Sequence, residues 1–380
     1  MRYTLTESLL LVCVLAVLIP GGDAAADGFF SGFKDTLDGD FDMSAWLSRA
    51  YGFMPVVSII TEPAIGPGAG LGLMFLNRDR SEIGQMITEP PDIAGVFGMY
   101  TANGSWGVGG GYRGYWKNDS IRYLGGLGYL SLNLKYYPAW PQDLSDKGVD
   151  FNIKGAGTIQ DLSFRIPKTR LFLGAAYTFF RSIVSLEIPL ESIDKWELDT
   201  NIGGLGATAV YDNRDNTFTP DNGIRTGIRY TFYSPTFGSD KTFDILNTYA
   251  LGYHLLGDRY MLALRLDGRF SFERTPFYMR PYIELRGVPA MRYQGEYTLV
   301  AETEFRWDFK YRWSLILFTG VGSAVPVNGG WDDRTDAYNF GGGLRYFLAR
   351  LYGIRAGIDV ARGPEEWALY ITIGQAWGRY

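Results

Sequence analysis

The feature that most constrains this chain is a two-residue alternation of apolar and charged side chains. In residues 297–309 every second position is apolar or aromatic, apart from one threonine. The positions between them include the charged residues Glu302, Glu304, Arg306 and Asp308. Residues 260–272 repeat the pattern, with Arg265, Asp267 and Arg269 on the charged side. Because successive side chains of a β-strand point to opposite faces, both runs predict strands with one oily and one charged face.

Composition agrees with a sheet protein. Aromatic residues make up 16% of the chain, with 26 Tyr, and there are 49 Gly. Sheets favour aromatic side chains and use glycine for bends and close approach. A soluble β-sandwich and a membrane β-barrel would both alternate in this way. Two observations favour the barrel: aromatic residues gather towards strand ends, and the links between strands alternate between short and long.

We expect about sixteen antiparallel strands, an even number as such barrels require. Their predicted ranges are 55–61, 66–77, 91–102, 105–117, 119–138, 149–166, 168–181, 197–212, 222–234, 241–256, 259–273, 295–309, 312–325, 336–349, 351–362 and 366–377. A sheet of this length left open in lipid would expose unpaired backbone groups, so closure into an all-β transmembrane barrel is expected.

The N-terminus has the order of a secretory signal peptide. Arg2 precedes an apolar run from Leu9 to Ile19, and small residues follow up to Ala26. A retained membrane anchor is the alternative interpretation. We therefore predict a signal peptide at 1–26, a periplasmic linker with a short helix near 44–51 within 27–54, and the barrel at 55–380. The linker acids do not have calcium-loop spacing and are expected to be solvated: Asp35, Asp38, Asp40 and Asp42.

Several function classes are disfavoured. The net charge of -5 offers no basic surface for nucleic acid. Cys13, the only cysteine, lies in the predicted signal peptide, so we expect neither a disulfide framework nor a thiol nucleophile. His254, the only histidine, is expected to point into the lumen, and no serine elbow accompanies it. We predict no catalytic residue, no metal site and no cofactor.

Charged residues on alternating positions are expected to face the lumen. Besides the two acids Glu302 and Glu304, they are Arg225, Arg229, Arg265, Asp267, Arg269, Arg306 and Asp308. One interpretation is a wet, partly neutralised interior. The other is a clamp for the long outward link 276–297, which contains Arg286 and Gly287, because a buried arginine is best paired with carboxylates.

The stretch YDNRDNTFTPDNG, residues 211–223, concentrates oxygen ligands between two predicted strands. A metal loop is one interpretation, but the spacing does not converge six oxygens. Asp and Asn side chains also hydrogen-bond nearby backbone in turns, which Pro and Gly punctuate. The residues that carry this turn are Asp212, Arg214, Asp215, Asn216, Pro220 and Gly223. We expect a turn at the midpoint of the barrel.

Three motifs resemble the BamA/TamA family of the bacterial surface antigen superfamily. They are the turn at 211–223, the sequence Leu285-Arg286-Gly287-Val288, and the run Phe318, Gly320 and Gly322 in the thirteenth strand. The resemblance implies that Arg286 enters the barrel and pairs with Glu304 and Glu302. Gly320 stands where the family has an aspartate, so the usual second acceptor is missing. The resemblance also implies a barrel-only member, without periplasmic POTRA-type repeats.

From this resemblance we expect an integral protein of the bacterial outer membrane that assists insertion or translocation of proteins or other envelope components. Substrate strands would pair at a seam between the first and last strands. Alternatives are a passive or gated pore for small solutes and a structural scaffold. The expected partners are outer-membrane lipids and unfolded outer-membrane or secreted clients, with the protein itself a monomer.

Overall fold

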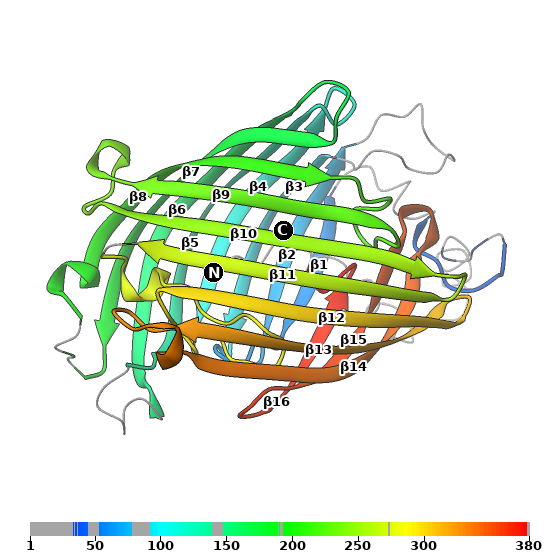
Figure 1. Cartoon of the computed structure of the whole chain (residues 1–380). Coiled ribbons are helices and arrows are strands. Elements are labelled where there is room, and N and C mark those ends of the chain that lie inside the picture. The colour runs from blue at the N-terminus through cyan, green and yellow to red at the C-terminus, as the bar shows by residue number, and fades with distance from the viewer. Residues whose placement is uncertain are drawn as a thin grey trace, which may run out of the picture.

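The strands of this protein form one sheet that curls into a barrel. The computed structural model describes residues 33, 35, 37–44, 53–77, 92–138, 147–188, 190, 193–272 and 274–377. Its 16-stranded antiparallel sheet runs in chain order from β1 to β16, as Figure 1 shows from blue to red. The strands are β1 (Phe53–Ile60), β2 (Gly68–Asn77), β3 (Asp92–Thr101), β4 (Trp106–Trp116), β5 (Ile121–Tyr136), β6 (Val149–Arg165), β7 (Leu171–Leu186), β8 (Asp199–Asp212), β9 (Gly223–Tyr233), β10 (Phe243–Leu256), β11 (Tyr260–Phe272), β12 (Tyr297–Lys310), β13 (Trp313–Val325), β14 (Thr335–Ala349), β15 (Ile354–Arg362) and β16 (Trp367–Ile373).

The predicted all-β barrel is confirmed, and every predicted strand has a counterpart. Two ends differ most. β7 continues to Leu186, past the predicted end at 181, because the alternation persists: Ile183 is exposed and Val184 is buried. β16 stops at Ile373 and not at 377, because Gly374 adopts a left-handed φ of 75° and turns the chain inward.

One boundary of the sheet is unsealed. Pairing runs from β1–β2 through β15–β16, and in the part of the chain that the structure describes no pairing joins β1 to β16. These two strands are short, with 8 and 7 residues, whereas β6 has 17. The barrel is therefore nearly closed, with one seam.

The outer wall is apolar. On β11 the outward side chains Leu262, Leu264 and Leu266 are exposed, while Arg265 and Asp267 on the alternate positions are buried inside. β12 repeats this with Leu299, Trp307 and Phe309 outside. This is the arrangement that a hydrocarbon environment requires. Among the described residues, no helix is long and apolar enough to span a membrane.

The predicted facing of β10 is wrong. We expected His254 to point into the lumen, but His254 is exposed, and its neighbours Leu251 and Tyr253 are buried inside. The interior is apolar at this point of the barrel. Trp377, in the inward-turned C-terminal segment, packs against Leu251, Tyr253 and Met261. An apolar side chain on this strand therefore faces protein, not lipid.

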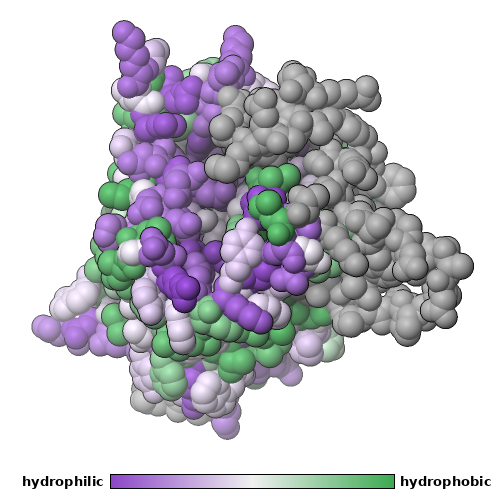
Figure 2. Space-filling model, turned by 90° about the vertical axis from the view of Figure 1, so that its right-hand side faces the viewer, coloured by the Kyte–Doolittle hydropathy of each residue, from purple (hydrophilic) through white to green (hydrophobic). Residues whose placement is uncertain are grey.

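The two ends of the barrel differ. The loop end, at the left of Figure 1, carries the link between β11 and β12 (residues 273–296), which we call loop 6. The turn end, at the right, carries the links that join even strands to the next odd strand, and several of them are tight, such as 257–259 between β10 and β11 and 311–312 between β12 and β13. Figure 2 looks onto the turn end, where hydrophilic residues gather, with hydrophobic residues towards the lower edge.

The linker acids are placed differently from expectation. Asp35 and Asp42 are buried and form ion pairs with Arg312 in the β12–β13 turn, so this stretch is not a solvated linker. The predicted helix near 44–51 lies almost entirely outside the described residues.

A lipid-facing outer wall predicts a depth-dependent cost of charge. Leu266→Arg, at the middle of β11, should destabilise the folded barrel by about 2–4 kcal/mol in urea unfolding in vesicles. Leu256→Arg, an identical change at the end of β10, should cost no more than about 1 kcal/mol. Equal costs at the two positions would contradict a lipid-facing wall.

Candidate functional site inside the barrel

Loop 6 folds into the barrel as a hairpin, in agreement with the interpretation of the link 276–297 as a segment clamped in the lumen. Tyr282 and Gln294 form a β-bridge, and the Gly295 amide donates to the Pro281 carbonyl over 2.9 Å. These backbone bonds fix the two arms against each other. The tip between them carries Arg286 and Gly287 to the inner wall of β12–β16.

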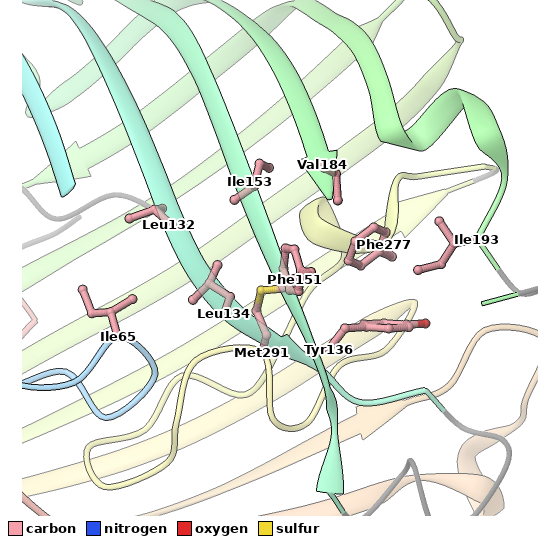
Figure 3. Close-up of a cluster of buried hydrophobic side chains, with 10 residues drawn as sticks. All are labelled: Ile65, Leu132, Leu134, Tyr136, Phe151, Ile153, Val184, Ile193, Phe277 and Met291. Carbon is pink, nitrogen blue, oxygen red and sulfur yellow. The ribbon is translucent and has the colours of Figure 1, made fainter. Parts of the chain in front are cut away.

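The base of loop 6 is held by an apolar cluster that the sequence pattern did not predict. Phe277 and Met291 pack on inward side chains of β5 and β6, including Leu134 and Phe151 (Figure 3). Nearby, Glu197 in the link before β8 accepts a hydrogen bond from the Phe277 amide over 2.7 Å. Burial raises the pKa of the Glu197 carboxyl. Loop 6 is thus anchored at the loop end by apolar packing on the inner wall of β5 and β6.

Arg286 is the central residue of an ion-pair network inside the barrel. Its Nε lies 3.0 Å from Glu302, and its Nη1 lies 2.9 Å from Glu304 and 3.1 Å from Asp359. The guanidinium also stacks on the Phe318 ring, with Cζ 3.4 Å from the ring centroid. One cation thereby joins β12, β13 and β15, and every contact is charge-assisted or made to an aromatic face.

The acids around Arg286 are themselves shared. Glu302 also accepts hydrogen bonds from Arg265 over 3.3 Å and from the Trp377 indole over 2.7 Å. Asp359 receives both terminal nitrogens of Arg345, at 2.6 and 2.7 Å. Glu302 and Asp359 thus each accept from more than one donor, which offsets the cost of burying their charge.

Asp359 takes the place of the missing acceptor. A Cβ at Gly320 would lie 2.8 Å from Asn339 Oδ1 and 2.9 Å from both the Ala301 carbonyl and Leu285 Cδ2, so a side chain has no room there. The loop occupies that space, and the carboxylate comes from β15. Alternation could have found it, because exposed Ile358 and Val360 leave Asp359 pointing inward.

Gly287 brings the loop tip onto the last two strands. Its φ is 83°, and a Cβ would lie 2.8 Å from the Gly363 amide nitrogen, so only glycine fits. Its amide donates to the Tyr370 hydroxyl of β16 over 2.8 Å. Val288 is buried with Leu285 in a small apolar cluster. The tip therefore contacts the seam strand β16 from inside.

The other predicted lumen charges fall into three groups. Arg265, Asp267 and Arg269 extend the Arg286 network to Glu284 of loop 6. Arg225, Arg306 and Asp308 join the turn between β8 and β9, through Asp212 and Asp221. Arg229 pairs separately with Asp161 of β6. The predicted residues are thus brought together as ion pairs and not as a dispersed charged lining.

The stretch 211–223 is a turn in which the oxygens have backbone and arginine partners. Asp215 accepts the amides of Asp221 and Asn222 at 3.0 Å each. Asn216 accepts the Phe218 amide over 2.7 Å, and Asp212 pairs with Arg214 over 2.8 Å. Among the residues that the structure describes, no group of three or more potential ligands is arranged to hold a metal ion.

The strand-thirteen motif residues serve packing. Phe318 lies under Arg286, and Gly320 gives room to Leu285. A Cβ at Gly322 would lie 2.6 Å from Ile283 Cγ2. In the turn motif, Gly223 has a φ of 112° beside Arg214, and Pro220 lines a small interior cavity with Arg306 and Trp377.

The fold has relatives among solved structures. BamA from Haemophilus ducreyi lacking POTRA domains 1–3 superposes with a TM-score of 0.57 at 13% identity, over 91% of this chain and 82% of that one. CdiB from Acinetobacter baumannii gives 0.55 at 13% identity, over 84% and 59%. CdiB from Escherichia coli gives 0.56 at 10%, over 84% and 61%. No family model and no curated protein matches the sequence. The chain shares the barrel fold of BamA and CdiB.

Removing Arg286 should be costly. Arg286→Ala leaves three buried carboxylates without their shared cation, so unfolding in urea should be easier by about 3–5 kcal/mol. The matched control is Arg334→Ala, whose partner Asp336 is exposed. That change should cost no more than about 1 kcal/mol. A heat-modified gel shift of Arg286→Ala at the parent's temperature would contradict the role of Arg286 in holding loop 6.

Filling Gly320 should not restore a family-like clamp. Gly320→Ala should destabilise by about 1–3 kcal/mol because the added carbon overpacks Asn339 and Leu285, and Gly320→Asp should cost more. Gly252→Ala is the control, because a Cβ added at Gly252 would have no neighbour within 4 Å; it should change stability by less than about 0.5 kcal/mol. A stabilised Gly320→Asp would show that Asp359 is not the replacement acceptor.

Proposed function

We propose that this chain is an outer-membrane barrel that assists insertion or translocation of proteins by pairing a client strand with the seam between β1 and β16. The observation that carries the proposal is the unpaired seam itself. In the hydrocarbon core of a membrane, unpaired backbone donors and acceptors are costly. The unpaired edge of β1 or β16 therefore favours hydrogen bonding to an incoming strand.

The small number of residue pairs next to the seam supports opening of the seam. β16 makes seven residue pairs with β15, whereas β5 and β6 are paired along 16 residues. Beyond Ile373 the chain leaves the sheet at Gly374. Fewer ladder bonds and a glycine turn mean that β16 can be displaced at lower cost than any long strand.

The interior network supports a lateral route over a passive pore. Loop 6 closes the loop end with packed apolar side chains, and Arg286 fixes its tip against β12 and β15. A solute would have to displace these contacts. A client strand at the seam would leave them in place.

The experiment uses proteoliposomes that contain this protein and a urea-denatured β-barrel client. Folding of the client should be faster than in protein-free vesicles or in vesicles with an unrelated closed barrel. A photo-crosslinker at Leu369, exposed on β16, should capture the client, whereas one at Leu205, exposed on β8, should not. Equal capture at both positions, or no gain in rate, would refute the proposal.

Conductance separates the alternative. In planar bilayers the parent should show low, fluctuating conductance, because loop 6 fills the lumen, and Arg286→Ala should raise it. A large, steady conductance in the parent would favour the pore for small solutes instead.

A further inference from the structure

We infer that residues 33–44 form a strap that holds the turn end of the seam shut. The described residues of this segment, which precedes β1, bind the turn end of β13–β15 on the far side of the seam. The strap acts on the same seam as the proposed function, and the experiment below measures the seam directly without a client.

The strap is a hairpin with its own internal bonds. The Asp35 amide donates to the Asp40 carbonyl over 2.9 Å, the Gly39 amide donates back to the Asp35 carbonyl over 3.0 Å, and Gly39 has a φ of 73°. The rings of Phe33 and Phe41 stack with centroids 5.7 Å apart. Three aspartates also cap nearby backbone amides: Asp35, Asp38 and Asp42. The segment therefore presents its carboxylates in a fixed order.

Its anchor is one buried arginine. Arg312, in the β12–β13 turn, contacts Asp35 at 2.5 Å and both Asp38 and Asp42 at 2.6 Å. Arg350, in the β14–β15 link, adds a second contact to Asp35 at 2.7 Å. The hydrogen bond from Arg350 holds the pKa of Asp35 well below its usual range, so this carboxylate stays charged.

Backbone bonds add position to this charge pairing. The Met43 amide donates to the Leu348 carbonyl over 2.8 Å, and the Tyr346 hydroxyl donates to the Phe41 carbonyl over 2.7 Å. The Ser44 hydroxyl oxygen accepts the Leu351 amide over 3.0 Å. Buried ion pairs with directed hydrogen bonds allow only one relative position of the two segments they join. The strap therefore binds the end of β14 in a single position.

The apolar side of the strap reaches both flanks of the seam. Phe33 and Met43 belong to one buried cluster that includes Met74 of β2 and Ile373 of β16. Ile354 of β15 belongs to it as well, and Ile93 of β3 packs against it. Strands on the two sides of the seam therefore share a core at the turn end, although no backbone pairing joins β1 to β16 within the described residues.

Loop 6 makes a corresponding bridge at the loop end. The Ala290 amide donates to Glu62, in the β1–β2 link, over 3.3 Å. Arg292 pairs with Glu365, in the β15–β16 link, over 3.1 Å. At the loop end, Met291 of loop 6 also shares a buried apolar cluster with Ile65 of the β1–β2 link. Only the turn-end bridge places three carboxylates on one buried arginine. The strap is thus the restraint on the turn end of the seam, as loop 6 is on the loop end.

The test measures the distance across the seam. Spin labels are placed at Phe75→Cys on β2, near the turn end, and at Ile358→Cys in the middle of β15, both exposed on the outer wall, with Cys13 replaced by serine. In the parent a single narrow distance distribution is expected. In the variant with Asp35→Asn, Asp38→Asn and Asp42→Asn, the distribution should broaden and lengthen by about the width of one strand, about 5 Å.

The matched control is Asp40→Asn, which removes the same charge from the same hairpin at an exposed aspartate that is not among the three carboxylates paired with Arg312. It should leave the distribution unchanged. A label at exposed Leu37 reports whether the strap has left its seat. If the strap stays docked in the triple variant, the seam distance is measured after deletion of residues 33–44 instead. An unchanged seam distance with the strap released or deleted would overturn the proposal.

The two proposals fail separately. A seam that widens on strap release, in a protein that does not speed client folding, would support the strap and refute the assembly function. Faster client folding, in a protein whose seam distance does not change when the strap is released, would support the assembly function and refute the strap.

Discussion

The structure depends on one constraint: in the hydrocarbon core of a membrane every backbone N–H and C=O needs a partner within the protein. Fifteen consecutive antiparallel pairings meet it around the wall, and the boundary between β1 and β16 is where the ladder is interrupted. The segments that leave the wall gather near this boundary. The tip of loop 6 contacts β16, the C-terminal residues turn inward beside it, and the strap packs across its turn end.

The Arg286 network shows how an interior can hold such segments in place. A single guanidinium serves three carboxylates and an aromatic ring, and the carboxylates in turn bind Arg265, Arg345, Asn339 and Trp377. Buried ion pairs of this kind add little net stability compared with apolar packing, but they are costly to break singly and thus specify position. Loop 6 is consequently fixed relative to the seam and not merely confined in the lumen.

Strand positions could be read from the sequence because the two-residue period is a property of each strand alone. The facing of a strand could not always be read, because it depends on what lies on the other side. On β10 the interior is occupied by Trp377, so Leu251 and Tyr253 point inward and His254 outward. The ion pairs of Asp359 and of the buried linker acids escaped prediction for a related reason: their partners are far away in sequence, on loop 6 and at Arg312.

By itself the sequence determined the sixteen strands, the long link 276–297 and the turn at 211–223, since alternation, link length and turn residues are local signals. Only the tertiary structure decided that Asp359 replaces an acceptor excluded at Gly320, that residues 374–377 fold inside, and that an acidic segment expected to be solvated is buried against Arg312. Burial and ion pairing arise between segments that meet only when the sheet curls, so no local pattern encodes them.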